Sequence, residues 1–219
     1  MHRYPILTAA YLAEASYSAQ THRSVAHRVQ SSLDHNDVQA HFLDNGILLI
    51  PGSNSVMDYL RFNLRVLRVG RKRYRIADDT TAEGASGTFW HQGFLAHAKE
   101  IWDWMEAKRQ RPTYIIGHSL GAAAAQILTK SYGCYGIGFA APRPRKHRGP
   151  LRHGDKCLCV NRDDDIVCTL PGTFHHVGKV HRCNPRRSAL GPDHSMSHYR
   201  KVVEEQQAAG TLARTWPDR

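Results

Sequence analysis

Hydrophobic residues recur along this chain with two spacings, one typical of strands and one typical of helices. Between residues 38 and 50, apolar residues alternate with polar ones as far as Phe42, the sequence DNG favours a turn, and Ile47–Ile50 forms an apolar run. This pattern predicts a β-hairpin. The sequence also predicts strands at residues 73–76, 113–117, 134–142, 155–161 and 175–182.

Helical spacing of apolar residues and alanine-rich composition predict helices at residues 5–29, 55–69, 91–110, 120–131 and 195–208. Over residues 55–69 the apolar stripe consists of Met57, Leu60, Leu64 and Leu67. Because strands and helices alternate in the middle of the chain, we predict an α/β fold with a mostly parallel sheet. No internal repeat or Gly/Ser-rich linker divides the sequence, which indicates one domain over residues 1–219.

The composition is that of a soluble globular protein, since 41% of the 219 residues are hydrophobic and 22% are charged. No apolar run approaches the ~20 residues that a membrane-spanning helix needs. The N-terminal segment has no continuous apolar stretch and contains Glu14. We therefore predict no signal peptide and expect a cytoplasmic protein.

The five cysteines, an odd number, favour free thiols over a set of disulfides. Cys157 and Cys159 are predicted to share one face of a strand, because side chains alternate along it. Together with Cys183 and nearby histidines they would make a zinc site. No C-x-x-C pair supports such a site, so we expect no metal.

The net charge of +11, together with 15 histidines, predicts attraction to an anionic surface, either nucleic acid or lipid headgroups. Within residues 57–75, arginines flank the apolar stripe of the predicted helix, which suits a helix that lies on an anionic membrane. The ordinary alternative, which we favour, is a surface helix with its arginines in water. Residues 142–156 are also basic but lack the interleaved aromatic residues of a single-strand-binding site, so nucleic acid is not an expected partner.

The sequence GHSLG places His118 and Ser119 between Gly117 and Gly121. By chance a chain of this length contains G-x-S-x-G in roughly 5–10% of cases, so the pattern alone is weak evidence. Its surroundings add more, because an apolar strand precedes it and an alanine-rich helix follows it. This arrangement is typical of a nucleophile elbow, which exposes the serine hydroxyl and aims the helix N-terminus at a developing oxyanion. The ordinary alternative is a serine in a tight turn.

A serine nucleophile needs a histidine base and a carboxylate that orients the base. In α/β-hydrolases both follow the serine along the chain. The candidates are three consecutive aspartates after a predicted strand, Asp163, Asp164 and Asp165, and two histidines before the last helix, His194 and His198. Spacing alone does not separate the members of either group.

Several motifs, in order along most of the chain, resemble the lipase class 3 family, the fungal triacylglycerol lipase-like α/β-hydrolases. They are ILLIPGS, HQGF, GHSLG, GFAAPRPR, NRDDDIVCTLP, HHVG and DHSMSHY. The resemblance implies an α/β-hydrolase fold with Ser119, Asp165 and His194 as a catalytic triad. It also implies an oxyanion hole made by the backbone N–H of Leu120 and by Ser53.

Three positions depart from the family pattern. Pro51 stands where the family has arginine, Ala140 where it has glycine, and Cys168 where it has proline. None of them supplies an atom to the predicted triad. The departures therefore bear on the shape of the loops, and through it on the substrate.

The resemblance implies hydrolysis of carboxylic ester bonds in lipids through an acyl-enzyme, with no cofactor. A hydrolase of short-chain esters or thioesters would use the same residues. A third hypothesis is a basic protein that keeps a hydrolase scaffold and binds lipid or nucleic acid without turnover. The complete set of serine, aspartate and histidine argues against this third hypothesis. The sequence does not predict an oligomeric state.

Overall fold

The computed structural model describes residues 3–35, 37–52, 66–69, 72–76, 80–184 and 194–218. Its centre is a seven-stranded sheet with the strand order β12-β11-β10-β9-β4-β3-β2. The strands are β2 (Val29–His35), β3 (Val38–Leu43), β4 (Ile47–Ile50), β9 (Tyr114–His118), β10 (Tyr135–Phe139), β11 (Cys157–Arg162) and β12 (Lys179–Cys183). Neighbouring strands from β4 to β12 are parallel, whereas β2 and β3 add antiparallel pairs at one edge. The predicted mostly parallel α/β fold is confirmed.

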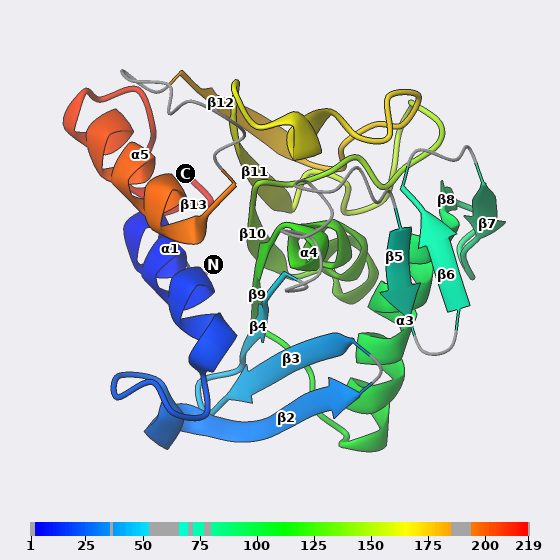
Figure 1. Cartoon of the computed structure of the whole chain (residues 1–219), viewed down its shortest axis with the longest axis horizontal. Helices are drawn as coiled ribbons and strands as arrows, with labels where there is room; N and C mark the ends of the chain where they lie inside the picture. Colours follow the sequence, from blue (N-terminus) through cyan, green and yellow to red (C-terminus); the bar gives the residue numbers. More distant parts are fainter. Residues whose placement is uncertain are drawn as a thin grey trace.

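Helices cover both faces of this sheet, as Figure 1 shows. Helices α1 (Ile6–Ala15) and α5 (Met196–Ala208) lie on one face, and α3 (Gln92–Ala107) and α4 (Leu120–Tyr132) lie on the other. In β4, Ile47 and Leu49 pack in the core shared with α1, while Leu48 and Ile50 pack in the core shared with α3 and α4. The central strands are thus buried on both faces, which is why their sequences are continuously apolar.

Among the described residues, three small pairs of strands lie outside the central sheet. They are β1 (Tyr4–Pro5) with β13 (Thr215–Trp216), β5 (Val66–Val69) with β6 (Lys72–Arg75), and β7 (Thr81–Glu83) with β8 (Phe89–His91). Short 3-10 helices occur at Ser16–Ser18, Ala26–Arg28 and Ile166–Thr169. Within the described ranges, every helix falls short of the length and apolarity that a membrane crossing requires.

The predicted helices at residues 91–110, 120–131 and 195–208 and the predicted hairpin are confirmed, with boundaries shifted by a few residues. The helix predicted at residues 5–29 is wrong beyond Ala15. Short turns follow, and Val29–His35 joins the edge of the sheet by pairing with β3. Backbone pairing with a preformed hairpin overrides the weak local preference of this polar segment for helix.

The helix predicted at residues 55–69 is wrong at its end, because Val66–Val69 is a strand that pairs with Lys72–Arg75. Leu67 and Arg68 therefore do not continue a helical stripe. Residues 53–65 lie outside the described residues, and so does most of the segment 57–75 that the membrane-surface hypothesis uses. That hypothesis stays a prediction.

Candidate active site

Ser119 lies in the turn between β9 and α4, at the carboxyl ends of the parallel strands. Its backbone has φ 56° and ψ −120°, a conformation that side chains other than glycine rarely adopt. The backbone N–H of Ser119 donates a 2.9 Å hydrogen bond to the carbonyl oxygen of Phe139, which ties the turn to β10. The sequence GHSLG thus forms the strained strand–turn–helix that was predicted from it.

Gly117 and Gly121 are required by close backbone approaches in this turn. A Cβ atom on Gly117 would lie 2.3 Å from the carbonyl oxygen of Gly121. A Cβ atom on Gly121 would lie 2.0 Å from the carbonyl oxygen of Ile50. Both distances are far inside van der Waals contact, and both partners are backbone atoms that cannot turn away. The two glycines let α4 start directly against β4 and β9.

Gly121→Ala is expected to lower the free energy of unfolding by about 3 kcal/mol or more, because the added methyl group displaces the backbone of β4 or α4. Urea unfolding of the purified variant measures this loss. Gly172→Ala is the matched control, since no atom lies within 4 Å of the Cβ it adds. The control is expected to stay within about 0.5 kcal/mol of the wild type. Equal stability of the two variants would contradict the close packing of the elbow.

A chain of hydrogen bonds joins the three residues that the family resemblance singles out. The Nε2 atom of His194 lies 2.7 Å from the Oγ atom of Ser119, and its Nδ1 atom lies 2.7 Å from Oδ2 of Asp165. All three side chains are buried. His194 and Asp165 follow Ser119 by 75 and 46 residues in the sequence. They meet Ser119 at the carboxyl ends of the parallel strands, because Asp165 follows β11 and His194 precedes α5, both beside the turn after β9.

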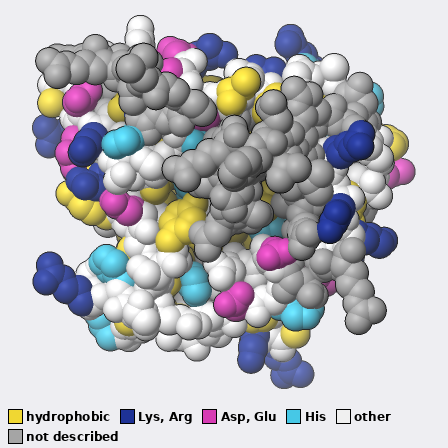
Figure 2. Space-filling view, viewed as in Figure 1, with side chains coloured by type: hydrophobic (Ala, Val, Ile, Leu, Met, Phe, Trp, Pro, Cys, Tyr) yellow, Lys and Arg dark blue, Asp and Glu magenta, His cyan; other side chains and the backbone are white. Residues whose placement is uncertain are grey.

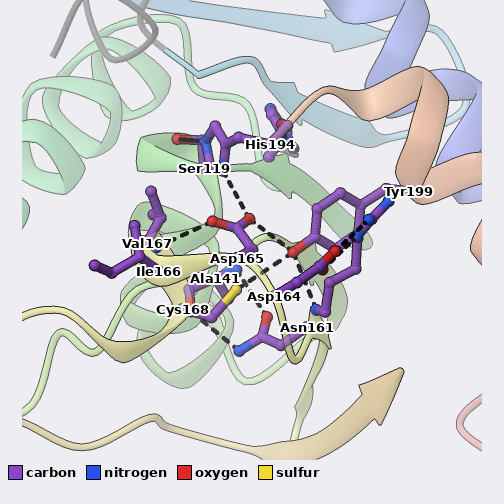
Figure 3. Close-up of polar contacts among 12 residues, drawn as sticks. Ser119, Ala141, Asn161, Asp164, Asp165, Ile166, Val167, Cys168, His194 and Tyr199 are labelled. Carbon is purple, nitrogen blue, oxygen red and sulfur yellow. Dashed lines mark hydrogen bonds and ion pairs between the residues drawn. The ribbon is translucent and has the colours of Figure 1, made fainter. Parts of the chain in front are cut away.

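Asp165 accepts two further hydrogen bonds, shown in Figure 3. Its Oδ1 atom accepts from the backbone N–H of Val167 at 3.0 Å, and its Oδ2 atom accepts from the hydroxyl of Tyr199 at 2.8 Å. Burial alone would raise the pKa of this carboxyl group, but hydrogen bonds from His194, Tyr199 and Val167 lower the pKa on balance. The geometry therefore holds a carboxylate anion beside the imidazole.

Tyr199 fixes Asp165 from the first turns of α5. Its hydroxyl donates to Asp165 and accepts a 3.1 Å hydrogen bond from the backbone N–H of Arg162, at the end of β11. The Sγ atom of Cys168 lies 3.3 Å from the same hydroxyl. In the sequence, Tyr199 is only the last residue of the motif DHSMSHY, and the structure gives it a contact with the carboxylate.

His118 connects the elbow to two other segments. Its Nε2 atom lies 3.0 Å from the backbone oxygen of His194, and its Nδ1 atom lies 2.5 Å from the hydroxyl of Tyr17. That hydroxyl in turn accepts a 3.0 Å hydrogen bond from the backbone N–H of Gly52. Because the oxygen of His194 accepts only, Nε2 of His118 carries the proton and Nδ1 accepts from Tyr17. Sequence analysis missed Tyr17, which lies far from every motif.

Burial, and after it the neighbouring His194, lowers the pKa of His118 from its usual 6.5 to about 3. Below pH 6.5 the unfolded chain therefore binds a proton on His118, whereas the folded protein keeps His118 neutral until the pH approaches 3. The contribution of His118 to stability is complete above pH 6.5 and is lost as the pH falls towards 3, with a loss of about 2 kcal/mol by pH 5.

His118→Gln is expected to remove this part of the acid sensitivity. Between pH 7.5 and pH 5, its free energy of unfolding should fall by about 2 kcal/mol less than that of the wild type. Urea unfolding at the two pH values measures the difference. His27→Gln, at an exposed histidine, should follow the wild type. A variant at His118 with an unchanged pH dependence would show that the buried neutral imidazole does not set it.

The structure separates the neighbouring candidates. Asp164 pairs with Arg162 at 2.7 Å, and Asp163 pairs with Arg182 at 3.3 Å on the surface. His198 lies on α5, whereas His194, just before this helix, contacts Ser119. Of the two groups that spacing left open, only Asp165 and His194 are in the hydrogen-bonded chain with Ser119.

Two segments approach Ser119 where an oxyanion would develop. Leu120 is the first residue of α4, so its backbone N–H has no partner within the helix. Gly52 packs directly against the serine, since a Cβ atom on it would lie 2.9 Å from Cβ of Ser119. Ser53, the other predicted donor, lies outside the described residues.

A small apolar pocket of about 10 Å³ adjoins Ser119. Besides Ser119 and Leu120 it is lined by Ile76, Phe94, Pro142, Val167 and Leu170. Loops after β6, β10 and β11 and the start of α3 supply these side chains. The lining suits a hydrocarbon group next to a reacting carbonyl.

The departures from the family pattern have structural counterparts. Ala140 has φ 52°, in the left-handed region that glycine favours, at the position where the family has glycine. Cys168 packs against Tyr199 and Asp165 within the core. Pro51 is buried at the end of β4.

The zinc alternative finds no support among the described residues, where no group of three or more suitable side chains comes together. Cys157 and Cys159 pack with Ala122 on the α4 side of the sheet, on one strand face as predicted. Cys183 packs on the opposite side, in the core shared with α1 and α5. The sheet itself thus separates Cys183 from the other two cysteines.

Solved structures of fungal lipases share this fold over most of the chain. The Rhizomucor miehei lipase propeptide complex matches with 15% sequence identity and a TM-score of 0.52, over 88% of this chain and 73% of that one. Lip2 lipase from Yarrowia lipolytica matches with 15% identity and a TM-score of 0.52, over 87% and 81% of the two chains. A triacylglycerol lipase from Penicillium expansum matches with 14% identity and a TM-score of 0.50, over 87% and 91%.

No protein-family model matches the sequence, and no curated protein matches it. The structural matches show that the chain has the α/β-hydrolase fold of fungal triacylglycerol lipases, as the sequence resemblance implied. At such low identity these matches establish the fold alone.

Proposed function

We propose that this protein is a serine hydrolase that cleaves carboxylic ester bonds of lipids. The observation that carries the proposal is the chain of two 2.7 Å hydrogen bonds from Ser119 through His194 to Asp165. The strained backbone of Ser119 supports it, because such strain persists where the surrounding structure holds a side chain in one orientation. The lipase fold supports it independently.

In the proposed reaction His194 takes the proton of the Ser119 hydroxyl as Oγ attacks the ester carbonyl. Asp165 accepts a hydrogen bond from Nδ1 of His194 and stabilises the imidazolium that forms. His194 then returns the proton to the leaving alcohol, which leaves an acyl group on Ser119. Water activated by the same imidazole hydrolyses this acyl-enzyme. No cofactor takes part in these steps.

The developing oxyanion needs two donors that already point at it. The backbone N–H of Leu120 is one, because it stands free of the helix at the positive end of the α4 dipole. Ser53 is the proposed second donor, through its backbone N–H and its hydroxyl. The contact of Gly52 with Ser119 supports this role, since Ser53 is the next residue along the chain.

The apolar side chains beside Ser119 are the proposed start of the acyl-chain site, and because the pocket they line measures about 10 Å³, a longer chain must extend beyond it. Hydrolysis of p-nitrophenyl esters with acyl chains from C2 to C16 tests the proposal. We expect the highest kcat/KM for a chain of C8 or longer, because burial of each CH₂ group contributes ~0.8 kcal/mol. A preference for C2 to C4 would make the protein a short-chain esterase with the same triad. Absence of turnover for every chain length by correctly folded protein would contradict the proposal.

A further inference from the structure

Basic side chains meet in a groove whose lining does not include Ser119, His194 or Asp165. Its volume is about 470 Å³, within the range of small-molecule sites. One wall comes from the loop after β10 and the other from the loop before β12. The positively charged or protonatable side chains that line it are Arg143, Arg145, His147, Arg148, His175 and His176. None of the described residues that line this groove is an aspartate or a glutamate.

Net charge alone does not define such a site. Lys and Arg side chains lie at several separate places around the outline of the face in Figure 2, as expected for a protein with a charge of +11. What distinguishes the groove is that its cations converge from two loops on one hollow without an acidic partner. We call it the arginine groove.

Backbone hydrogen bonds hold the two walls together. The N–H of Arg143 donates to the oxygen of Leu170 at 2.7 Å. Arg145 and His175 exchange two backbone hydrogen bonds, of 3.1 and 2.7 Å, as a short antiparallel bridge. The groove is therefore preformed, which lowers the entropic cost of ordering these loops when a ligand binds.

The arginines of the groove have donors to spare. Arg143 donates one side-chain hydrogen bond, to the oxygen of Gly172 at 3.3 Å, and Arg148 donates one, to Nδ1 of His175 at 3.4 Å. Neither guanidinium contacts a carboxylate in the described part of the chain, whereas Arg162 is held by Asp164. Because a guanidinium has five N–H donors, most of those on Arg143 and Arg148 are available to a ligand.

The charges in the groove act on each other. Burial, and after it the charges of Arg148 and the other arginines of the groove, lowers the pKa of His175. The hydrogen bond from Arg148 to Nδ1 leaves the proton of a neutral His175 on Nε2, where it is a further donor. Repulsion among these cations destabilises the empty groove, and an anion would relieve it.

The arginine groove begins at the rim of the apolar pocket. Pro142 and Leu170 line the pocket beside Ser119, and Arg143 follows Pro142 directly while its N–H bonds to Leu170. A substrate whose ester lies at Ser119 therefore has an anion-binding surface next to it along the same two loops. Phe174 is the only phenylalanine, tyrosine or tryptophan among the described lining residues and it is buried, so the groove offers a base none of the large aromatic platforms of a single-strand-binding site.

We propose that the arginine groove binds the phosphate of a phosphorylated lipid headgroup, so that the preferred substrates are phospholipids and not neutral acylglycerols. The proposal rests on the hydrolase function proposed above. Planar guanidinium groups bind phosphate oxygens with paired, charge-assisted hydrogen bonds, and several of them suit a tetrahedral anion with more than one charge.

The test compares two water-soluble substrates with the same acyl chains, dihexanoyl phosphatidic acid and dihexanoylglycerol. The wild type is expected to show a kcat/KM at least about tenfold higher for the phosphorylated substrate. In the double variant R143Q/R148Q this ratio should fall at least about tenfold, chiefly through a higher KM, because the variant lacks two charge-assisted contacts. The matched control R23Q/R111Q removes the same charge from exposed arginines elsewhere and should keep the wild-type ratio. A wild type without preference, or equal ratios in the two double variants, would overturn the proposal.

A binding measurement separates this proposal from the hydrolase function. Glycerol 3-phosphate and inorganic phosphate are titrated into the wild type and both double variants, with the ring signals of the histidines followed by NMR. A response at His175 that R143Q/R148Q loses supports the groove even if no ester is turned over, which would overturn only the hydrolase function. Binding of glycerol 3-phosphate more tightly than phosphate identifies a headgroup, and equal affinity identifies free phosphate. Tighter binding of a single-stranded oligonucleotide, lost in the same variant, would overturn the lipid proposal in favour of nucleic acid.

Discussion

Ser119→Ala is expected to lower kcat for p-nitrophenyl octanoate by a factor of roughly 10⁴–10⁶, to the rate that binding and oxyanion donors alone support. The substitution removes the atom that is proposed to attack the carbonyl and leaves the backbone as it is. Alanine has the same Cβ atom as serine, so that the φ of 56° is no harder to adopt. The variant loses only the hydrogen bond to His194, which stabilises the fold by about 1 kcal/mol. Steady-state rates and urea unfolding, measured on the same preparation, separate the chemical effect from a folding defect.

Labelling by a fluorophosphonate probe gives a second measurement that needs no knowledge of the substrate. The wild type and Ser131→Ala are expected to be labelled, because Ser131 lies at the opposite end of α4 from Ser119 and its hydroxyl donates to the oxygen of Ile127. Ser119→Ala should stay unlabelled. Unlabelled but folded wild-type protein would favour a protein that keeps the lipase scaffold for binding alone. Activity retained in Ser119→Ala would place the nucleophile elsewhere.

The fold could be predicted where burial on both faces leaves a strong pattern. Residues 47–50 and 114–117 are apolar because helices cover both sides of the sheet, and this pattern identified them as strands. The edge strand Val29–His35 left no such pattern, since most of its residues are partly or fully exposed and its position depends on pairing with β3. The strand Val66–Val69 likewise depends on its partner Lys72–Arg75. Helical spacing in this part of the chain indicated the wrong element.

The candidate site could be predicted only as far as its motifs reach. Spacing in the sequence did not distinguish Asp163, Asp164 and Asp165, and only the family resemblance identified Asp165 as the candidate. The structure gives the physical difference, because Asp163 and Asp164 are neutralised by Arg182 and Arg162 while Asp165 alone turns inward to His194. No motif indicates Tyr17, whose contact with His118 exists only once α1 has packed on the sheet. The sequence shows one wall of the arginine groove as the basic segment 142–156. The second wall comes from residues 172–176, which the sequence does not connect with that segment.

Asp165→Asn is expected to lower kcat by a factor of roughly 10³–10⁴ while KM changes little. The carboxylate accepts from three donors, the imidazole of His194, the hydroxyl of Tyr199 and the N–H of Val167. An amide has only one accepting oxygen, so either orientation of the new side chain turns an NH₂ group towards a donor. With the oxygen towards His194, the tautomer is kept but the imidazolium of the transition state lacks its counter-charge. With the NH₂ group towards His194, the ring is driven into the tautomer whose Nε2 carries the proton and cannot take that of Ser119.

Steady-state rates with p-nitrophenyl octanoate measure this loss, and urea unfolding of the same preparation shows that the variant is folded. Asp163→Asn is the matched control, because this exposed neighbour pairs only with Arg182 on the surface, and its rates should stay within about threefold of the wild type. If Asp163→Asn loses as much activity as Asp165→Asn, the loop and not the buried carboxylate is responsible, and the third member of the proposed triad must be sought elsewhere.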